Sequence, residues 1–179
     1  PVREVVVRDT LDITKLDVNT FQFTGYGFTD SVYLFFERDT VFANEIDLRP
    51  AKNTKLRVVG KLNKSNGALE WRFSSYDPVT YALTNIVSDG FLNPNVTAPE
   101  GEGFVTYMIK PLAGLPHGSV IQNKAIIYFD YNDPIETPVW VNTIDDVKPQ
   151  SVVSPLPATI TDTVFNISWS GVDNHSGVM

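Results

Sequence analysis

The chain has 179 residues, of which 14 are basic and 21 acidic, so its formal net charge is −7. The absence of cysteine excludes disulfide scaffolds, thiolate metal sites and cysteine nucleophiles. The acidic balance argues against binding to a nucleic-acid backbone, and no apolar run is long enough for insertion into a membrane. Because 42% of the residues are hydrophobic, a buried core is expected, in a soluble piece of a longer protein.

Short runs in which apolar and polar residues alternate follow one another along the chain. Period-two patterns of β-branched and aromatic residues predict half-buried β-strands. In chain order these runs lie at 5–11, 21–23, 32–36, 56–60, 69–73, 104–109, 121–129 and 139–144. Residues 40–48 contain the one helix-like spacing, Phe42 and Ile46, over a segment too short to support a helix.

Turn residues separate the predicted strands. Asn66-Gly67 between two apolar runs is a strong hairpin signal, because both residues accept a positive φ. Twelve prolines and eleven glycines, scattered at similar intervals, leave no room for a long helix. We therefore predict an all-β fold, an antiparallel β-sandwich of immunoglobulin-like or jelly-roll-like type.

A domain boundary is expected near Asp145, Asp146 and Pro149, where a Pro- and Ser-rich stretch begins. Residues 1–146 would form the β-sandwich module. Residues 147–179 would form a linker and the truncated start of an immunoglobulin- or fibronectin-like domain, with strands at 151–154 and 164–169. A lone pair of strands is marginal in water, and its edges invite a strand-paired dimer with another copy.

Several segments resemble a recurring module of large secreted or surface-attached bacterial multidomain proteins, a conserved-repeat domain of unknown function. The matching segments are residues 56–60, 69–73, 76–80, 101–105, 109–116, 127–135 and 142–145. Residues 168–173 resemble the opening of the immunoglobulin- or fibronectin-like repeat that often follows this module. The resemblance implies an extracellular or cell-surface location and a spacer, adhesive or accessory role.

The densest acidic group is the segment 130–136. Calcium takes about six to eight oxygen ligands from carboxylates, amides and carbonyls. The candidate ligands here are Asp130, Asn132, Asp133 and Glu136. The alternative is structural, because Asn132-Asp133-Pro134 is also a good turn in which the side chains bond their own backbone.

Two further acidic groups are weighed as calcium sites. Asp145 and Asp146 lie at the linker, where calcium would stiffen a junction, and Asp173 and Asn174 would join them if the second domain folds back. The other group, on the loop expected after the first strand, comprises Asp9, Asp12 and Asp17. An exposed, solvated acidic surface is the alternative for both groups.

Carbohydrate binding is the second hypothesis, since sugar rings stack on exposed aromatic side chains. Tyr76, Tyr81 and Trp140 are the candidates, whereas Trp71 alternates with core residues and is expected inside. Trp140 lies on the face opposite Val139 and Val141, where packing against a neighbouring domain is the favoured interpretation.

The sequence contains few residue patterns that are typical of catalytic sites. His117 and Ser119 share a turn without a nucleophile-elbow pattern, and His117 is expected to face solvent. His175 lies near the end of the chain, and Lys124 is expected to point outward. The sequence therefore favours a non-enzymatic extracellular structural or adhesive module, with calcium as suspected cofactor. Its expected partners are neighbouring domains of the same chain, and a polysaccharide or another cell-surface ligand. A carbohydrate-binding module is the alternative, and a hydrolase fragment the third choice.

Overall fold

The computed structural model describes residues 1–161 and 164–173, and this part of the chain is all-β and antiparallel, as predicted. One short 3-10 turn, η1, spans Val87–Asp89. The strands are β1 Glu4–Thr10, β2 Leu16–Phe28, β3 Ser31–Glu37, β4 Val41–Asp47, β5 Lys55–Asn63, β6 Ala68–Tyr76, β7 Gly103–Pro111, β8 Val120–Asn123, β9 Ala125–Phe129, β10 Ile135–Glu136, β11 Trp140–Thr143, β12 Gln150–Val153 and β13 Trp169–Val172.

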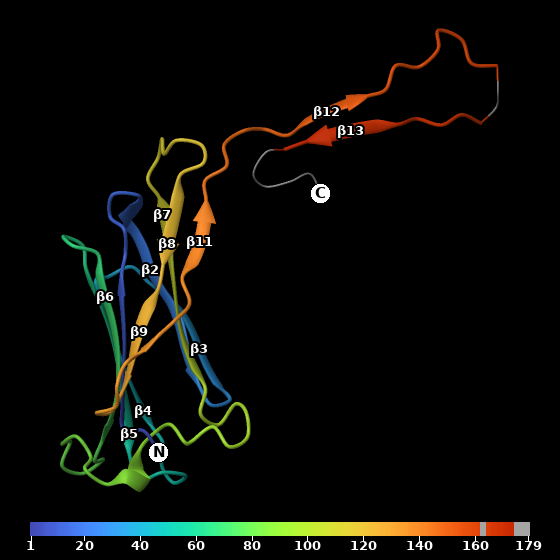
Figure 1. The fold of residues 1–179 in the computed structure, drawn as a ribbon. Helices are drawn as coiled ribbons and strands as arrows, with labels where there is room; N and C mark the ends of the chain where they lie inside the picture. The colour runs from blue at the N-terminus through green and yellow to red at the C-terminus, as the bar shows by residue number, and fades with distance from the viewer. Residues whose placement is uncertain (162–163, 174–179) are drawn as a thin grey trace. The chain divides into compact units, whose positions relative to one another are not determined.

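Two sheets form the layers of a β-sandwich. The larger sheet has the strand order β10-β9-β1-β6-β5-β4, and the smaller sheet has the order β3-β2-β7. Figure 1 shows them as facing layers, with β6 in one and β3 in the other. Two further pairs, β11-β8 and β12-β13, form two-stranded sheets.

The chain divides into two compact units. Unit 1 comprises residues 1–113 and 122–140, and unit 2 comprises residues 114–121 and 141–179. Unit 1 holds both layers of the sandwich, and unit 2 holds the β12-β13 pair. The boundary that the sequence suggests after residue 146 stays a prediction.

Aromatic rings from the two layers fill the core of unit 1. Phe23 of β2 meets Trp71 of β6 edge to face, with 5.0 Å between centroids, and Tyr26 meets Phe73 in the same way at 5.7 Å. Trp71 is 1% exposed, which confirms its predicted place in the core. Edge-to-face pairs of this kind add about 0.5–1.5 kcal/mol each to the free energy gained by burying their area.

Residues 41–47 form strand β4. In a strand, Phe42, Asn44 and Ile46 share one face; Phe42 and Ile46 are half-buried on it, whereas Asn44 is exposed. Asn44 breaks the apolar alternation that would have predicted a strand here. Its Nδ2 donates to the hydroxyl of the buried Tyr26 at 2.8 Å, so Asn44 satisfies a polar group of the core from the apolar face of β4.

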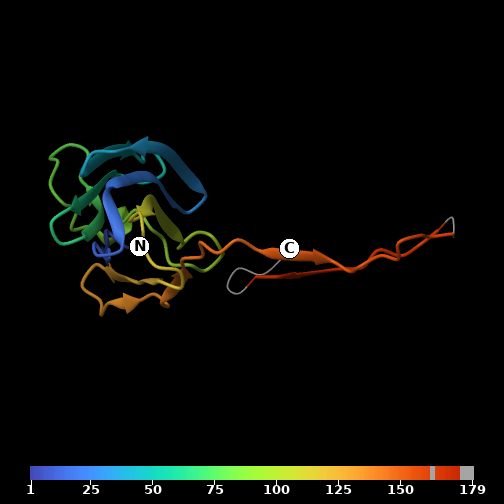
Figure 2. The same cartoon turned by 90° about the horizontal axis from the view of Figure 1, so that it is seen from above.

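Unit 2 contains an antiparallel ribbon in which β12 pairs with β13. Val153 lies opposite Trp169 and Gln150 opposite Val172, and the two strands run side by side in Figures 1 and 2. The sequence places the second strand at 164–169, whereas the structure begins it at Trp169 and continues it to Val172. The pairing with residues 150–153 sets this register, which periodicity alone does not reveal.

No helix in residues 1–161 and 164–173 combines the length and the apolar character needed to cross a membrane.

Candidate functional site

The acidic loop begins with Asp130, which directly follows β9. Its backbone takes a positive φ of 50°, a conformation that Asp tolerates better than most residues. Its Oδ1 accepts hydrogen bonds from the backbone N–H groups of Arg3, at 3.0 Å, and Glu4, at 2.8 Å. The Asp130 carboxylate therefore ties the loop to the start of β1.

The other residues of the acidic segment lie on a turn and a short edge strand. The N–H of Asn132 donates to the carbonyl of Phe129 at 3.0 Å, which closes a backbone turn over residues 129–132, and Asp133 is exposed. The turn expected at 132–134, with side chains bonding their own backbone, stays a prediction. Glu136 of β10 forms an ion pair with Lys124 at 2.8 Å. Lys124 thus points outward, which confirms the sequence-based expectation.

The linker carboxylates meet the turn around His117 within unit 2. The Nδ1 of His117 lies 3.3 Å from an oxygen of Asp145 and 3.3 Å from an oxygen of Asp146. The N–H of Gly118 donates to the carbonyl of Ile144 at 2.8 Å, which holds the turn beside the linker. His117 lies on a turn, as expected, and its side chain is half-buried, with 28% exposed.

The remaining acidic candidates are Asp173 in unit 2 and the group of Asp9, Asp12 and Asp17 in unit 1. Asp173 is half-buried in unit 2, while Asn174 and His175 lie outside the described residues. Asp9 is in β1 and Asp17 in β2, so the expected single loop carrying Asp9, Asp12 and Asp17 was wrong. Within residues 1–161 and 164–173, no three His, Asp or Glu side chains are grouped so as to hold a metal ion.

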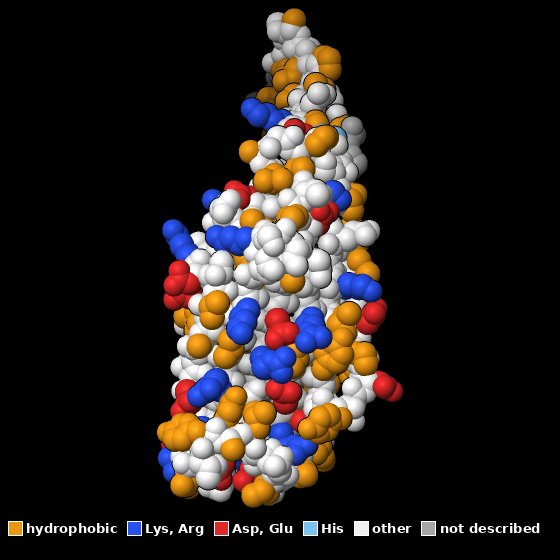
Figure 3. Space-filling model, turned by 90° about the vertical axis from the view of Figure 1, so that its left-hand side faces the viewer, with side chains coloured by type: hydrophobic (Ala, Val, Ile, Leu, Met, Phe, Trp, Pro, Cys, Tyr) orange, Lys and Arg blue, Asp and Glu red, His pale blue; other side chains and the backbone are white. Residues whose placement is uncertain are grey.

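The outer face of the six-stranded sheet carries charges of both signs. Figure 3 shows Lys and Arg side chains interspersed with Asp and Glu over this face. On β1 and β6, Arg8 pairs with Glu70 at 2.9 Å, and Arg72 pairs with Glu4 at 2.8 Å and with Glu70 at 3.2 Å. Opposite charges on neighbouring strands satisfy one another here, as cross-strand pairs do on a solvated sheet face.

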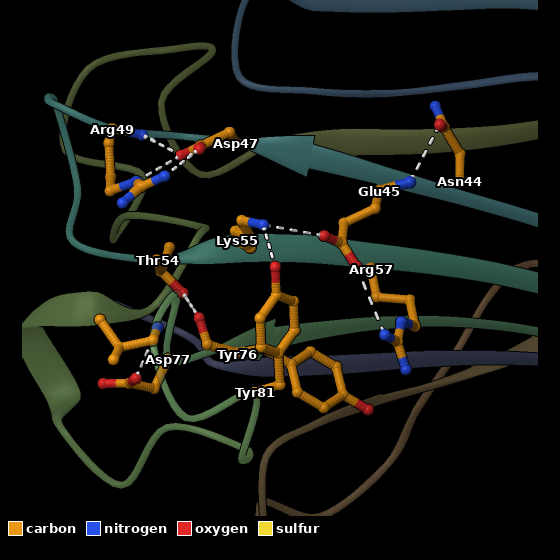
Figure 4. A network of polar contacts seen from close by, with 11 residues as sticks. Asn44, Glu45, Asp47, Arg49, Thr54, Lys55, Arg57, Tyr76, Asp77 and Tyr81 are labelled. Atoms are coloured by element: carbon orange, nitrogen blue, oxygen red, sulfur yellow. Dashed lines mark hydrogen bonds and ion pairs between the residues drawn. The ribbon is translucent and has the colours of Figure 1, made fainter.

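Two carbohydrate candidates, Tyr76 and Tyr81, belong to the same charged face (Figure 4). The ammonium of Lys55 lies 4.6 Å from the centre of the Tyr81 ring and bonds its hydroxyl at 2.6 Å. The guanidinium of Arg57 lies 4.7 Å from the centre of the Tyr76 ring. A cation therefore sits against each ring that sugar stacking would use.

Charged groups on this face shift the pKa values of neighbouring side chains. Hydrogen bonds to the Tyr81 hydroxyl and to Glu45 raise the pKa of Lys55 above its ordinary value. The side chain and backbone of Arg49 hold the pKa of Asp47 well below its usual range. Lys55, Asp47 and Arg49 therefore stay charged at neutral pH. Trp140, the third aromatic candidate, is 71% exposed on β11.

Sequence reasoning missed a polar cluster inside unit 1. Asp9 of β1 is 9% exposed, and its Oδ2 accepts hydrogen bonds from the Tyr107 hydroxyl and from Asn123 Nδ2, both at 2.8 Å. Asn123 Nδ2 also lies 3.0 Å from the Tyr107 hydroxyl. These residues are far apart in the sequence, so only their inward positions in alternating strands hinted at the cluster.

Residues 60–143 match a family model described as a domain of unknown function (DUF7619). The chain is therefore similar over this segment to a domain of unknown function, and the secreted, multidomain context stays a prediction. No curated protein and no solved structure matches the chain.

Proposed function

We propose that the chain is a non-enzymatic structural or adhesive module of a secreted or cell-surface bacterial multidomain protein. In this proposal the sandwich of unit 1 is a rigid scaffold, and the ribbon of unit 2 provides the first strands of a neighbouring immunoglobulin- or fibronectin-like domain. The match to a domain of unknown function is compatible with this role but assigns no activity.

The observation that carries the proposal is the exposure of the ribbon formed by β12 and β13. Its apolar side chains are mostly in solvent, with exposed fractions of 66% for Val152, 59% for Val153, 65% for Trp169 and 64% for Val172. Two strands without further cover are marginal in water, and exposed apolar surface marks sites of contact. A continuing sheet in a neighbouring domain of the same chain would cover these side chains.

Limited proteolysis with chymotrypsin tests this proposal. We expect early cleavage after Trp169, inside β13, while the buried aromatic residues of the sandwich are cut only when unit 1 unfolds. The product should keep the thermal unfolding midpoint of the parent sandwich. Resistance at Trp169 for as long as the sandwich survives would mean that the ribbon is already covered, and the proposal would fail.

Calcium enters this proposal as a stabiliser of the acidic loops. The supporting features are the oxygen-bearing side chains of Asp133 on its exposed turn and of Asp145 and Asp146 at the linker. Calcium at about 100 times its dissociation constant would stabilise the fold by about 2.7 kcal/mol. Thermal melts with calcium and with EDTA measure this effect. Identical midpoints would remove calcium from the proposal.

Matched variants locate the calcium effect. Asp133→Asn or Asp146→Asn should reduce the calcium-dependent shift in midpoint. Asp39→Asn, which changes an exposed acid in the turn between β3 and β4, should leave the shift intact. An equal loss in the Asp39 variant would indicate general charge screening instead of a site.

A carbohydrate-binding role is the second candidate, favoured by the 71% exposure of Trp140 and the 52% exposure of Tyr81. Retention on immobilised polysaccharides measures it. Loss of retention in Trp140→Ala or Tyr81→Ala would support this role, whereas retention that survives both changes would exclude these aromatic residues as the binding platform.

A further inference from the structure

A cavity of about 350 Å³, open to solvent on one side, lies in unit 1 between the two layers of the sandwich. Strands β1, β6 and β9 line it from the six-stranded sheet, and β2 and β7 from the other sheet. Its walls are mostly apolar, and they include Val7, Trp71, Phe73, Val105 and Ile127. The volume falls within the range of about 300–1,000 Å³ typical of small-molecule sites.

Two polar atoms on this wall lack a hydrogen-bond partner among the described residues. One is Asp9 Oδ1, on a residue that is more than nine-tenths buried, and the other is Trp71 Nε1, on a residue that is 1% exposed. Both residues line the cavity. A buried polar group without a partner costs about 1–3 kcal/mol, and a charged one costs more.

The contacts of Asp9 define what its free oxygen requires. The Tyr107 hydroxyl and Asn123 Nδ2 both bind Oδ2, so they fix the carboxylate and leave the buried Oδ1 without a donor among the described residues. Burial, together with the adjacent Asp9 carboxylate, raises the pKa of Tyr107 above its ordinary value. Tyr107 therefore remains a neutral donor at physiological pH, and Asp9 Oδ1 is the carboxylate oxygen left to accept a further hydrogen bond.

We propose that this cavity binds an apolar small molecule whose polar end donates a hydrogen bond to Asp9 Oδ1. Alcohols and protonated amines share this chemistry. The apolar part of the ligand lies between the sheets, where it covers apolar side chains of the cavity wall. Trp71 Nε1 offers a donor to an oxygen atom of the ligand. An anionic head group is disfavoured, because it would place a second negative charge beside Asp9.

The cavity is large enough for such a molecule. An apolar cavity of about 150 Å³ is known to hold benzene, and this cavity has more than twice that volume. A chain of about eight carbon atoms with a single head group is therefore a reasonable probe. The same chain with different head groups separates the contribution of the head from that of the apolar part.

Isothermal titration of the full chain with 1-octanol, octylammonium and octanoate tests the proposal. We expect the alcohol, the ammonium or both to bind one molecule per chain, at least tenfold more tightly than octanoate. A preference for octylammonium over octanol would identify charge pairing with Asp9, and equal binding would identify the hydrogen bond alone. Failure of both donors to bind, or equal binding of octanoate, would overturn the proposal.

Two variants assign the binding to this cavity. Ala125→Phe, which adds a ring to the cavity wall without changing Asp9, should abolish binding. Asp9→Asn should weaken donor-headed probes at least fivefold and reduce their advantage over octanoate. If Asp9→Asn does not fold, the head-group series and Ala125→Phe still decide the matter. Tyr131→Phe, at a side chain that is 95% exposed, is the matched control and should bind like the parent. Unchanged binding in Ala125→Phe would place the ligand elsewhere and refute the proposal.

Discussion

Gly60 of β5 lies where the core leaves no room for a side chain. A Cβ at this position would stand 2.7 Å from Cε1 of Phe23, whose ring is completely buried. Phe23 in turn packs edge to face on Trp71 and Phe21, so it has little freedom to move. The missing side chain at residue 60 is therefore part of the packing of the aromatic core.

Gly60→Ala should destabilise the sandwich by about 1–3 kcal/mol through overpacking. Denaturant unfolding measures the loss. The control is a double-mutant cycle with Phe23→Leu, which removes the ring that the new methyl group meets. We expect the alanine to cost less in the Phe23→Leu background. Equal costs in both backgrounds would disprove the contact as the cause.

Tyr107 fixes the buried carboxylate of Asp9. Tyr107→Phe removes one of two donors to Asp9 Oδ2 and should cost about 1.5–3 kcal/mol, because the acceptor is a carboxylate with little access to water. Tyr131→Phe removes a hydroxyl from an almost fully exposed residue and should change stability by less than about 0.5 kcal/mol. Similar losses in both variants would contradict this role of Tyr107.

At the scale of elements, the charged residues of β1 and β6 link neighbouring strands. Burial raises the pKa of Glu70, but hydrogen bonds from Arg8 and Arg72 lower it by more, so its pKa lies below its ordinary value. The unfolded chain therefore binds a proton to Glu70 more readily than the folded chain does. Its contribution to stability is present above the ordinary pKa of about 4.3 and disappears as the pH falls through the lower folded value.

Glu70→Gln should therefore make unfolding less dependent on pH in the acidic range. Urea unfolding at pH 7, 5, 4 and 3 measures this, and the variant should lose less stability on acidification than the parent. Glu100→Gln changes an exposed loop residue and serves as the matched control, expected to follow the parent curve. A parallel pH dependence in Glu70→Gln and the parent would show that the pairs with Arg8 and Arg72 add no stability.

The strands themselves were predictable from sequence because alternation is a local property. Residues 69–73 and 104–109 alternate clearly and lie in β6 and β7. β4 was not predictable, because Asn44 interrupts its apolar face and bonds Tyr26, a residue of another strand. The cluster around Asp9 was not predictable either, because its members are distant in sequence: Tyr107 lies 98 residues from Asp9, and Asn123 lies 114 residues from it.

Among the candidate site residues, contacts between segments far apart in the sequence were not predictable. The turn expected at Asn132-Asp133-Pro134 stays a prediction, because the hydrogen bond found there joins the Asn132 N–H to the carbonyl of Phe129. Contact of Asp145 and Asp146 with His117 depends on pairing between the turn at 114–119 and residue 144, which no short motif encodes. The calcium-binding role of these acids stays a prediction.

At the scale of the whole molecule, the two units differ in how they bury apolar residues. Unit 1 encloses its aromatic side chains between two sheets, as the complete burial of Phe23 and Tyr26 illustrates. The ribbon of unit 2 leaves Val152 and Trp169 largely exposed. A structural module that contacts a neighbouring domain would show this difference between its two units, because the contact would cover the exposed apolar side chains of the ribbon.

Native-state hydrogen exchange tests the proposed module most directly. The amides of residues 71–73 in β6 should exchange only on global unfolding, whereas those of residues 151–153 and 169–172 should exchange orders of magnitude faster, through local opening of the ribbon. Adding calcium should leave this contrast in place. If the ribbon amides were as strongly protected as those of β6, the ribbon would be stable without a neighbouring domain, and the central claim would be contradicted.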